Sequence, residues 1–387
     1  MFARYVSVRL LALRQPSCRG AAPEARPKAS PLHSSAAAMS LPKEYKKLVC
    51  TKTSPNFREA VSVVTVPAPA SLNANEVFLK TKYAGVNASD INATAARYGG
   101  TTKPPFDIGF ESVAEVVAVG AGVGHLKVGD AVATLNFPEF GAFAEYQLTE
   151  ATKAFPIPAA VPEVIPLLVS GLTAAMGLDQ QGRIKEGETV LVTAAAGGLG
   201  HLAVQWAKAA KCHVIGTCSS PDKEVYLKSI GCDKVINYKT QDLSTELQKA
   251  YPRGVDVVWE TVGGKTFDTL LKRLARRGRL VVIGAISGYQ NSDKPFPDVD
   301  LHDLPYKLLS RSTSVSGFLL SDYAHLIPQY VAKLTQMLQE GRLVPKVDLG
   351  ANAEGGELLG LDGCFRGVEY LHSGKSVGKV VVKVHDS

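Results

Sequence analysis

The feature that most constrains this chain is a glycine-rich turn between an apolar run and an amphipathic segment. Residues 189–193 read TVLVT, and residues 194–200 read AAAGGLG before the segment HLAVQWAKAAK begins. The apolar run predicts a buried strand, and the segment after the turn predicts a helix. The spacing of Ala194, Gly197 and Gly200 removes side chains where the turn tightens, so free N–H groups at the helix start can face a pyrophosphate. This context favours a dinucleotide site in a βαβ unit over a tight turn without a ligand.

The rest of the chain is organised in three stretches of different character. The first contains short β-rich runs separated by glycine and proline, which predicts a small β-barrel or sandwich-like domain. In the second, apolar runs alternate with amphipathic segments, as is typical of a parallel sheet covered on both faces. The third ends in VGKVVVKV, a strand expected to rejoin the first domain. We therefore expect an α/β fold with an amino-terminal segment at 1–38, a β-rich domain made of 41–164 and 306–387, and an inserted doubly wound parallel-sheet domain at 165–305.

Charge separates the amino-terminal segment from the rest. The formal net charge is +7, and the first 48 residues carry all of it, because the remaining chain has equal numbers of acidic and basic residues. Net charge therefore gives no reason to expect nucleic-acid binding. The segment 1–38 is rich in arginine and serine and poor in acids, which predicts a mitochondrial presequence. A non-targeting extension with a start at Met39, and a peroxisomal or cytoplasmic location, stay open.

Two further classes of protein are disfavoured by the residue pattern. No stretch approaches the roughly 18 unbroken apolar residues of a membrane-spanning helix, so no membrane span is expected. The cysteines show neither a C-x-x-C pair nor a ligand spacing with histidine, which predicts reduced, buried thiols and no metal site. They are Cys18, Cys50, Cys212, Cys218, Cys232 and Cys364.

The second strand of the parallel sheet indicates which dinucleotide is bound. An NAD site usually has an acidic residue at the end of this strand to hold the ribose 2′-hydroxyl. Here the strand CHVIGT ends without an acid, and Ser219 and Lys223 follow. Hydroxyl groups and a cation suit a 2′-phosphate. We therefore expect NADPH, although Asp222 and Glu224 flank the lysine and leave a plain solvated helix start as the alternative.

At this point the chain resembles the medium-chain dehydrogenase/reductase superfamily from about residue 45 onward. The resemblance is carried, in family order, by GVNASD at 85–90, GFESVAEVVAVG at 109–120, VGD at 128–130, GAFAEY at 141–146, SGLTAA at 170–175 and the glycine-rich turn. It implies a GroES-like catalytic domain interrupted by a Rossmann domain, and a homodimer formed through the Rossmann sheets. Zinc-dependent members carry a cysteine and a histidine where this chain has Ala88-Ser89 and Phe110, so it resembles the zinc-free reductase branch.

Within that branch the resemblance implies a reaction. It points to NADPH-dependent reduction of the C=C bond of α,β-unsaturated ketones, with 15-oxoprostaglandins as expected substrates. A quinone oxidoreductase has the same fold and hydride donor, and a non-catalytic NADPH-binding sensor would keep the glycine-rich turn. Both stay open as alternatives.

Two residues are expected to act in the reaction. Tyr289 follows the run RLVVIG, at the crevice where open α/β sheets bind ligands, and matches the family tyrosine that contacts cofactor and carbonyl. Asn87 matches the superfamily position that bonds the cofactor ribose or amide. Tyr98 is a second candidate donor, although a wall of the substrate pocket is its favoured role, and solvent is a third source of the proton. A surface-loop aromatic at Tyr289 and a turn-forming Asn87 are the competing structural interpretations.

The resemblance also implies a set of cofactor contacts. For the apolar members, plain core packing is the competing interpretation. The expected contacts are Gly197, Leu199, Gly200, Ser219, Lys223, Tyr238, Thr261, Ile283, Tyr289, Phe318, Leu319, Leu320 and Ser376. Two basic features are expected to have structural roles only: His201 near the domain surface, and Lys272–Arg279 at the end of a helix.

Overall fold

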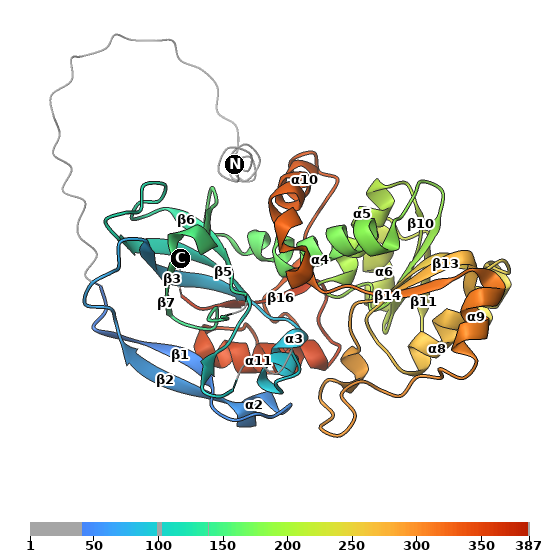
Figure 1. Ribbon diagram of the computed structural model, residues 1–387, viewed down its shortest axis with the longest axis horizontal. Coiled ribbons are helices and arrows are strands. Elements are labelled where there is room, and N and C mark those ends of the chain that lie inside the picture. The colour runs from blue at the N-terminus through green and yellow to red at the C-terminus, as the bar shows by residue number, and fades with distance from the viewer. Residues whose placement is uncertain (1–40, 99–102, 138, 386–387) are drawn as a thin grey trace, which may run out of the picture.

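The computed structural model describes residues 41–98, 103–137 and 139–385. The predicted presequence, together with Cys18, lies outside these residues. The described chain forms a β-rich lobe and a parallel-sheet lobe, with α4 (Val169–Gly177) and α10 (Ile327–Gln339) at the junction between them (Figure 1). No helix in the described ranges is long and apolar enough to cross a bilayer.

The β-rich lobe contains two sheets and the carboxyl-terminal helix. A three-stranded sheet has the order β2 (Val61–Pro67), β1 (Glu44–Cys50), β4 (Phe106–Asp107). The larger sheet has the order β15 (Val347–Asp348), β16 (Lys379–Lys383), β3 (Glu76–Gly85), β5 (Glu111–Val119), β6 (Ala131–Leu135), β8 (Ala154–Pro156), with β7 (Tyr146–Glu150) also paired to β3. The helices are α2 (Phe57–Ala60), α3 (Ser89–Thr94) and α11 (Gly360–His372).

The second lobe is built on a six-stranded parallel sheet. Its order is β11 (Lys234–Asn237), β10 (His213–Cys218), β9 (Thr189–Val192), β12 (Val255–Glu260), β13 (Leu274–Val282), β14 (Ser314–Gly317). The helices of this lobe are α5 (Gly200–Ala209), α6 (Pro221–Ser229), α7 (Leu243–Ala250), α8 (Lys265–Lys272) and α9 (Leu304–Arg311). The order reverses direction at β9, which places a crevice between β9 and β12 at the carboxyl ends of the strands.

Alternating side chains of the central strands cover the two faces of this sheet. Val190 and Val192 pack in one core cluster with residues of α4, α5 and α10. Leu191 points to the opposite face and packs with residues of α7 and α8. A strand buried on both faces needs a continuous apolar run, which explains the sequence TVLV. The predicted α/β fold class, with a doubly wound parallel sheet, is confirmed.

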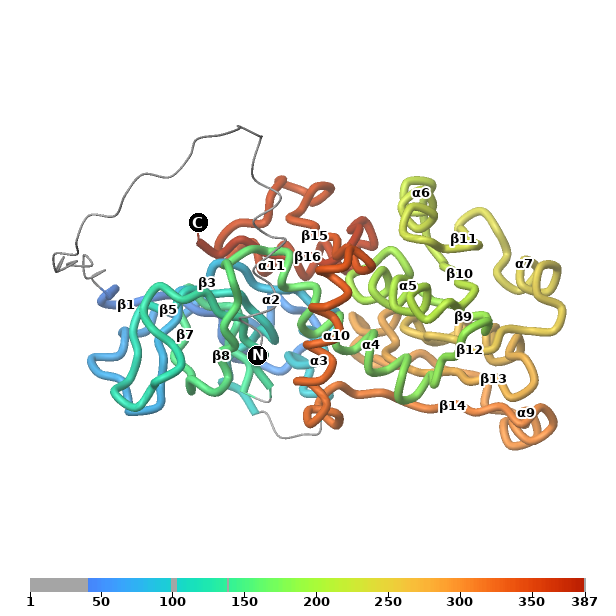
Figure 2. Tube along the Cα trace, turned by 90° about the horizontal axis from the view of Figure 1, so that it is seen from above, coloured from blue at the N-terminus to red at the C-terminus, as the bar shows by residue number. Residues whose placement is uncertain are grey.

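The parallel sheet extends beyond residue 305, where the sequence pattern ended that domain. Strand β14 pairs in parallel with β13, and Tyr330 and Leu334 of α10 pack in the core of the same lobe. The segment Ser314–Gly317 is polar because it lies at the sheet edge, so it carried no apolar signal. The chain returns to the β-rich lobe at β15, and β16 pairs with β3 (Figure 2). The last strand therefore rejoins the first domain, as expected.

Two local predictions were wrong. The segment Lys272–Arg279 was expected at the end of a helix, but α8 ends at Lys272 and strand β13 starts at Leu274. The strand bulges, since Val255 pairs with Leu274 while Val257 pairs with Arg279. Basic residues sit in this bulge, where side chains reach solvent. His201 was expected near the surface, yet its exposed fraction is 0%.

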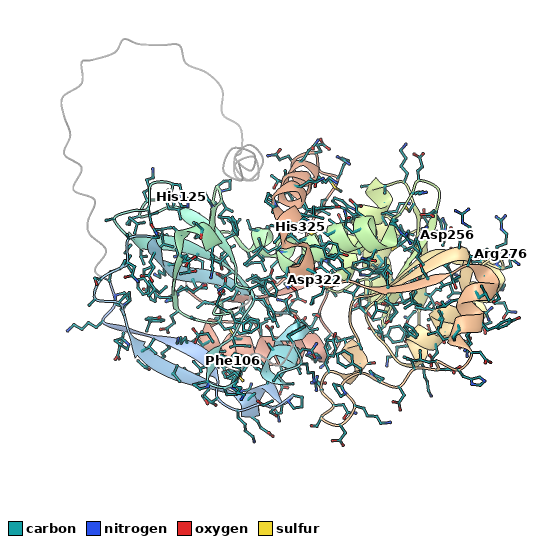
Figure 3. All side chains as sticks on the ribbon, in the orientation of Figure 1. Phe106, His125, Asp256, Arg276, Asp322 and His325 are labelled. Carbon is teal, nitrogen blue, oxygen red and sulfur yellow. The ribbon has the colours of Figure 1, made fainter. Side chains whose placement is uncertain are left out.

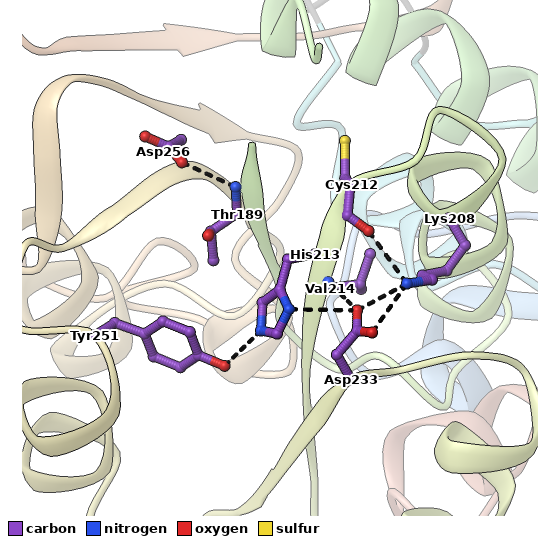
Figure 4. Close-up of polar contacts among 8 residues, drawn as sticks. All are labelled: Thr189, Lys208, Cys212, His213, Val214, Asp233, Tyr251 and Asp256. Carbon is purple, nitrogen blue, oxygen red and sulfur yellow. Dashed lines mark hydrogen bonds and ion pairs between the residues drawn. The ribbon is translucent and has the colours of Figure 1, made fainter. Parts of the chain in front are cut away.

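Polar side chains also gather at the amino ends of the strands of the parallel sheet. Asp256 and Arg276 lie at the end of the molecule away from the β-rich lobe, whereas Asp322 lies near the junction (Figure 3). At the same edge, the first residue of β10, His213, lies 2.8 Å from the hydroxyl of Tyr251 (Figure 4). These groups join the amino ends of strands, so they stabilise the sheet and lie outside the ligand crevice.

Candidate functional site

The predicted cofactor residues share one position in the fold. Most of them come directly after a strand of the parallel sheet, at its carboxyl end. Ser219 follows β10, Tyr238 follows β11, Thr261 follows β12, Ile283 follows β13 and Phe318 follows β14. Because parallel strands point the same way, these residues gather along one edge, beside the glycine-rich turn that follows β9.

The glycine-rich turn has the geometry of a phosphate cradle. A Cβ atom at Gly200 would lie 2.4 Å from the carbonyl oxygen of Ala194, so only glycine fits where α5 begins. Within 4 Å, a Cβ at Gly197 would meet only that same oxygen, so the space beside it is open. Among the described residues, the N–H groups of Leu199 and Gly200 have no hydrogen-bond acceptor, whereas the preceding part of the turn forms a β-bridge between Gly197 and Gly378. Free N–H groups at a helix start suit the pyrophosphate of a dinucleotide.

The side chain of His201 stabilises this turn by hydrogen bonds. Its Nδ1 lies 2.9 Å from the carbonyl oxygen of Gly197, and its Nε2 accepts a hydrogen bond from the N–H of Lys346 at 3.1 Å. An Nε2 that accepts requires the proton on Nδ1. Burial lowers the pKa of His201 to about 4, so the ring is neutral at physiological pH. The ring therefore connects the turn to the chain that leads back to the β-rich lobe.

Lys223 lies where a 2′-phosphate is expected. It stands in the first turn of α6, which Ser220 caps by accepting a hydrogen bond from the Lys223 N–H at 3.4 Å. The ammonium group donates to the carbonyl oxygen of Gly374 at 2.6 Å, and burial lowers its pKa. This contact joins α6 to the loop that carries Ser376. The ammonium thus has a neutral carbonyl as its hydrogen-bond partner, and Cys218 at the end of β10 and Asp348 are near enough to raise its pKa against the effect of burial.

The remaining predicted contacts differ in exposure. Tyr238 is 51% exposed and Leu319 is 49% exposed, so both side chains are open to a ligand. Phe318 and Leu320 are each 7% exposed and belong to the core of the parallel-sheet lobe. The hydroxyl of Thr261 lies 3.0 Å from that of Thr193, which holds the end of β12 beside the end of β9. Ser376 is buried in the loop before β16.

Tyr289 lies at the boundary between the lobes. It follows the short 3₁₀ helix Ile286–Gly288 and packs in the same cluster as Ile91 and Phe110 of the β-rich lobe. Its hydroxyl oxygen accepts a hydrogen bond from the N–H of Ala285 at 3.0 Å. Within the described part of the chain, the hydroxyl proton has no acceptor, so it is available to a ligand oxygen.

Asn87 is held by a buried charged pair. The ammonium of Lys379 lies 2.6 Å from the Asn87 Oδ1 and 2.6 Å from the Glu111 Oε1, and neither charged side chain is more than 2% exposed. The Asn87 amide donates to Glu111 at 3.0 Å and to the Gly85 carbonyl at 3.4 Å. Both amide hydrogens are used, so only a lone pair of Oδ1 remains. This narrows its predicted role to accepting a hydrogen bond from a ligand.

The same charged pair touches the glycine-rich turn. A Cβ atom at Gly198 would lie 3.0 Å from the side chain of Lys379, and the N–H of Gly378 donates to the Ala196 carbonyl at 2.8 Å. The other Glu111 oxygen accepts from the Val169 N–H at 2.7 Å, at the start of α4. Lys379 and Glu111 therefore connect the larger sheet of the β-rich lobe, the glycine-rich turn and α4.

Asp90 completes this buried group. Its Oδ2 accepts from the Asn87 N–H at 2.8 Å, while its Oδ1 has no partner among the described residues. Burial raises the pKa of Asp90 to about 8, against the opposing effect of Lys379. At neutral pH the carboxyl group is therefore mostly protonated, which lowers the cost of an unpartnered buried oxygen.

Aromatic side chains form a wall beside Tyr289. Phe110 contacts Tyr98, Phe137 and Phe140 with ring centroids 6.4, 5.0 and 4.9 Å apart. Burial raises the pKa of Tyr98 to about 12, and nearby Tyr289 acts in the same direction. Tyr98 therefore stays protonated at neutral pH. The wall is apolar, with two phenolic hydroxyl groups close to one another.

No group of three or more histidine, cysteine, aspartate or glutamate side chains that could hold a metal ion occurs in the described ranges. The cysteines in those ranges, Cys50, Cys212, Cys218, Cys232 and Cys364, are free and buried. The prediction of buried, unpaired thiols is confirmed for these five.

Several site residues were not predicted from the sequence. Glu111 stands in the motif GFE and Lys379 in the final strand, but their pairing joins positions far apart in the chain. Asp90 lies in the motif NASD, where a turn role was the simpler interpretation. Arg97 precedes Tyr98 and donates to the carbonyl oxygen of Tyr289 at 2.7 Å. Only the adjacency of Arg97 to a candidate tyrosine was a usable signal.

Comparison with known proteins agrees with this fold. Residues 198–339 match the model described as zinc-binding dehydrogenase, and residues 73–159 match the alcohol dehydrogenase GroES-like domain. Prostaglandin reductase-3 of Mus musculus is 47% identical over 348 residues, which is 89% of this chain and 90% of that protein. A probable quinone oxidoreductase of Leishmania amazonensis is 44% identical over 348 residues, 89% of this chain and 100% of that protein.

A solved structure gives the same result. The quinone oxidoreductase of Escherichia coli, crystallised with NADPH, superimposes with a TM-score of 0.73 and 29% identity, covering 87% of this chain and 99% of that chain. The GroES-like and Rossmann organisation is thus confirmed. The chain belongs to the medium-chain dehydrogenase/reductase superfamily, in the family that includes prostaglandin reductase-3.

Proposed function

We propose that this protein reduces the C=C bond of α,β-unsaturated ketones with NADPH, and that 15-oxoprostaglandins are among its substrates. The observation that carries the proposal is the position of Tyr289. Tyr289 follows the carboxyl end of β13 and packs in one cluster with Phe110, and its hydroxyl proton has no acceptor among the described residues. The similarity to prostaglandin reductase-3 over 89% of the chain supports the same reaction class.

The residues present suit each requirement of this reaction. When bound, NADPH supplies a hydride to the β-carbon of the substrate. Tyr289 donates its proton in a hydrogen bond to the carbonyl oxygen, where negative charge develops. Asn87 accepts a hydrogen bond from the cofactor and so fixes its orientation. Tyr98, protonated at neutral pH, or solvent provides the proton for the α-carbon.

The cofactor preference follows from the groups at the end of β10. Lys223 supplies a cation in the first turn of α6, the helix after β10, and no acidic side chain stands at the end of that strand. An acid there would hold an unphosphorylated ribose and repel a 2′-phosphate. The aromatic wall of Phe110, Phe137 and Phe140 suits an apolar substrate chain.

The reaction is tested on purified protein that starts at residue 39. Oxidation of NADPH is followed by absorbance with a 15-oxoprostaglandin and, in parallel, with a quinone, and the products are identified by mass spectrometry. We expect a saturated ketone, and slow turnover of the quinone. Turnover of the quinone alone would contradict the proposal and favour a quinone oxidoreductase, which the Leishmania and Escherichia coli relatives support as the second candidate. NADPH binding without turnover of either compound would favour a sensor.

We further propose that the protein forms a homodimer through the parallel sheets. Strand β14 ends the sheet order and has a neighbour on one side only. The adjoining helix α9 exposes Tyr306 to 69% and Leu309 to 79%. Replacing both residues with aspartate should yield a monomer by light scattering, whereas the control Val63→Asp, on the exposed face of β2, should leave the mass unchanged. A monomeric wild-type protein would contradict the dimer.

We also propose that residues 1–38 direct the protein to mitochondria, on the basis of their arginine-rich composition. A fluorescent protein fused behind these residues should enter mitochondria, and replacement of Arg4, Arg9 and Arg14 by glutamine should abolish entry. Cytoplasmic or peroxisomal fluorescence of the unmodified fusion would contradict this location.

A further inference from the structure

Arg97 connects the β-rich lobe to the loop that carries Tyr289. One guanidinium nitrogen donates to the carbonyl oxygen of Tyr289 at 2.7 Å, and another donates to that of Asn291 at 2.9 Å. Arg97 follows α3 in the β-rich lobe, whereas both acceptors follow β13 of the parallel sheet. In the described part of the chain, Arg97 makes the only side-chain hydrogen bonds from the β-rich lobe to residues 286–291.

The arginine is firmly held at its own end. Its N–H donates to the carbonyl oxygen of Asn92 at 2.9 Å, and its guanidinium donates to the Asn92 Oδ1 at 3.1 Å. Asn92 itself is 3% exposed, within α3. The side chain therefore projects from a fixed base, so that the lobe and the loop cannot shift independently while these bonds persist.

The three guanidinium acceptors are neutral oxygen atoms. Arg97 forms no ion pair with any described residue, and burial lowers its pKa, an effect that Tyr289 opposes. A half-buried cation without a counter-ion is costly unless its hydrogen bonds are well placed. The planar fork of arginine matches two carbonyl groups at once, which an ammonium cannot do.

The other hydrogen bonds of the loop lie within the parallel-sheet lobe. The N–H of Ile286 donates to the Thr261 carbonyl at 3.0 Å, and the hydroxyl of Ser287 donates to the Val262 carbonyl at 2.6 Å. Within the loop, Gly288 donates to the Ala285 carbonyl at 2.9 Å, Asn291 donates to the Gly288 carbonyl at 2.8 Å, and the Tyr289 N–H makes a long 3.4 Å bond. These bonds shape the turn but do not fix its distance from the opposite lobe. Against the β-rich lobe, the loop is held by apolar packing of Tyr289 with Ile91 and Phe110, which has no fixed direction, and by the directional hydrogen bonds of Arg97.

We propose that Arg97 is a positioning residue that holds the Tyr289 loop against the β-rich lobe and so aligns the tyrosine hydroxyl with the substrate carbonyl. The inference rests on the proposed reaction for its catalytic consequence, but not for the contact itself. A displacement of about 1 Å at a reacting group can cost about a hundredfold in rate. Cofactor affinity should change much less than kcat, because Tyr289 is only one of the expected cofactor contacts, and Lys223 and the glycine-rich turn lie on other elements.

The test compares Arg97→Met and Arg97→Lys with wild-type protein, and uses Arg366→Met as a matched control. Arg366 also donates to backbone carbonyls, those of Glu354, Gly356 and Glu357, but entirely within the β-rich lobe. The measurements are kcat and KM for a 15-oxoprostaglandin, the Kd for NADPH, and hydrogen–deuterium exchange of residues 286–291 without ligands.

We expect Arg97→Met to lower kcat at least about tenfold, with the Kd for NADPH within about twofold of wild type, and to speed exchange at 286–291. The kcat of Arg97→Lys should lie between the values of wild type and Arg97→Met. Added guanidinium ion should partly restore the kcat of Arg97→Met. Unchanged exchange at 286–291, or faster exchange with an unchanged kcat, would overturn the proposal. Faster exchange throughout the chain in both variants would also overturn it, because the role would then be general stability.

The two proposals fail in different ways. If wild-type protein does not reduce the enone, the proposed reaction is wrong, yet the exchange measurement still reports whether Arg97 restrains the loop. If wild-type protein reduces the enone and Arg97→Met matches the Arg366→Met control in every measurement, only the positioning role is wrong.

Discussion

The hydroxyl of Tyr289 accepts one hydrogen bond from its own turn, and this contact decides what the group can do. Because the oxygen is engaged by the Ala285 N–H at 3.0 Å, the proton is directed away from that turn. Asn87 presents the opposite case, since both of its amide hydrogens are used and only an acceptor remains. At the scale of single residues, the hydrogen bonds already made thus leave Tyr289 as a donor to the substrate and Asn87 as an acceptor for the cofactor.

The donor role predicts the effect of removing one hydroxyl group. Tyr289→Phe should lower kcat for the enone by about a hundredfold, because a hydrogen bond to the developing negative charge is lost. The Kd for NADPH, measured by fluorescence titration, should stay within about twofold. Full activity in the phenylalanine variant would exclude Tyr289 as the donor and favour Tyr98.

Lys223 predicts the preference between the two nicotinamide cofactors. Lys223→Ala should raise the Kd for NADPH by about tenfold to a hundredfold, because a charge-assisted hydrogen bond to the 2′-phosphate is lost. NADH affinity should hardly change. Calorimetric titration with both cofactors measures the difference, and Lys228→Ala, whose ammonium pairs with Glu224 at 2.8 Å on the same helix, is the control. Equal weakening of both cofactors would contradict the assignment.

Asp90 predicts a dependence of stability on pH. Burial raises its pKa from 3.8 to about 8. Because the folded-state pKa lies above the unfolded value, the protonated carboxyl is fully compatible with the fold below about pH 4, and stability is lost as pH rises through about 8. Asp90→Asn, which cannot ionise, should therefore melt at a higher temperature than wild type at pH 8, with a smaller difference near pH 5. The opposite trend in thermal melts would show that Asp90 is ionised in the fold.

At the scale of elements, the start of α5 depends on close backbone approach. The glycine-rich turn brings the Ala194 carbonyl to the point where the helix begins, and Ala194 has a φ of 45°, in the left-handed region. The turn is then held by His201 on one side and by Gly378 on the other, where Gly378 donates to the Ala196 carbonyl. The shape of the cofactor turn therefore depends on the turn itself, on His201 of α5 and on the chain at Gly378.

This packing predicts the cost of one methyl group. Gly200→Ala places a Cβ atom 2.4 Å from the Ala194 oxygen, which should destabilise the protein by about 1–3 kcal/mol and weaken NADPH binding more than tenfold. Denaturant unfolding and cofactor titration measure the two effects. Gly124→Ala is the matched control, because a Cβ there meets nothing within 4 Å. Normal NADPH affinity in Gly200→Ala would remove the turn from the cofactor site.

At the scale of the whole molecule, two of the contacts that couple the lobes lie beside the candidate site. Lys379 and Glu111 form a buried pair that reaches the cofactor turn and α4, and Arg97 reaches the Tyr289 loop. Both contacts involve chain segments that are distant in sequence. Together they fix the crevice from its two sides.

The buried pair predicts a large change in stability. Lys379→Met leaves Glu111 as an uncompensated buried charge and should cost about 3–5 kcal/mol in denaturant unfolding. The double variant Lys379→Met, Glu111→Gln should recover much of that loss, since no charge then remains. A double variant as unstable as the single one would show that packing of the Lys379 stem, rather than its charge, stabilises the junction.

The sequence by itself determined the fold class and the place of the cofactor turn, because both depend on local patterns. The run TVLV and the glycine spacing specify a buried strand and a tight helix start within a dozen residues. The order of motifs also identified the superfamily. A local pattern failed where it was weak, at polar β14 and at the bulge of β13, since edge strands and bulges carry no apolar period.

Only the tertiary structure decided which polar groups meet at the crevice. Lys379 lies 292 residues from Asn87, and Arg97 lies 192 residues from Tyr289. Nothing in the local sequence specifies such pairs, because their distance depends on how sheets and lobes pack. The pKa of Asp90, the neutral His201 and the free proton of Tyr289 arise from the same packing. Burial and hydrogen-bond partners are properties of the folded chain, so the chemistry of the site became visible only there.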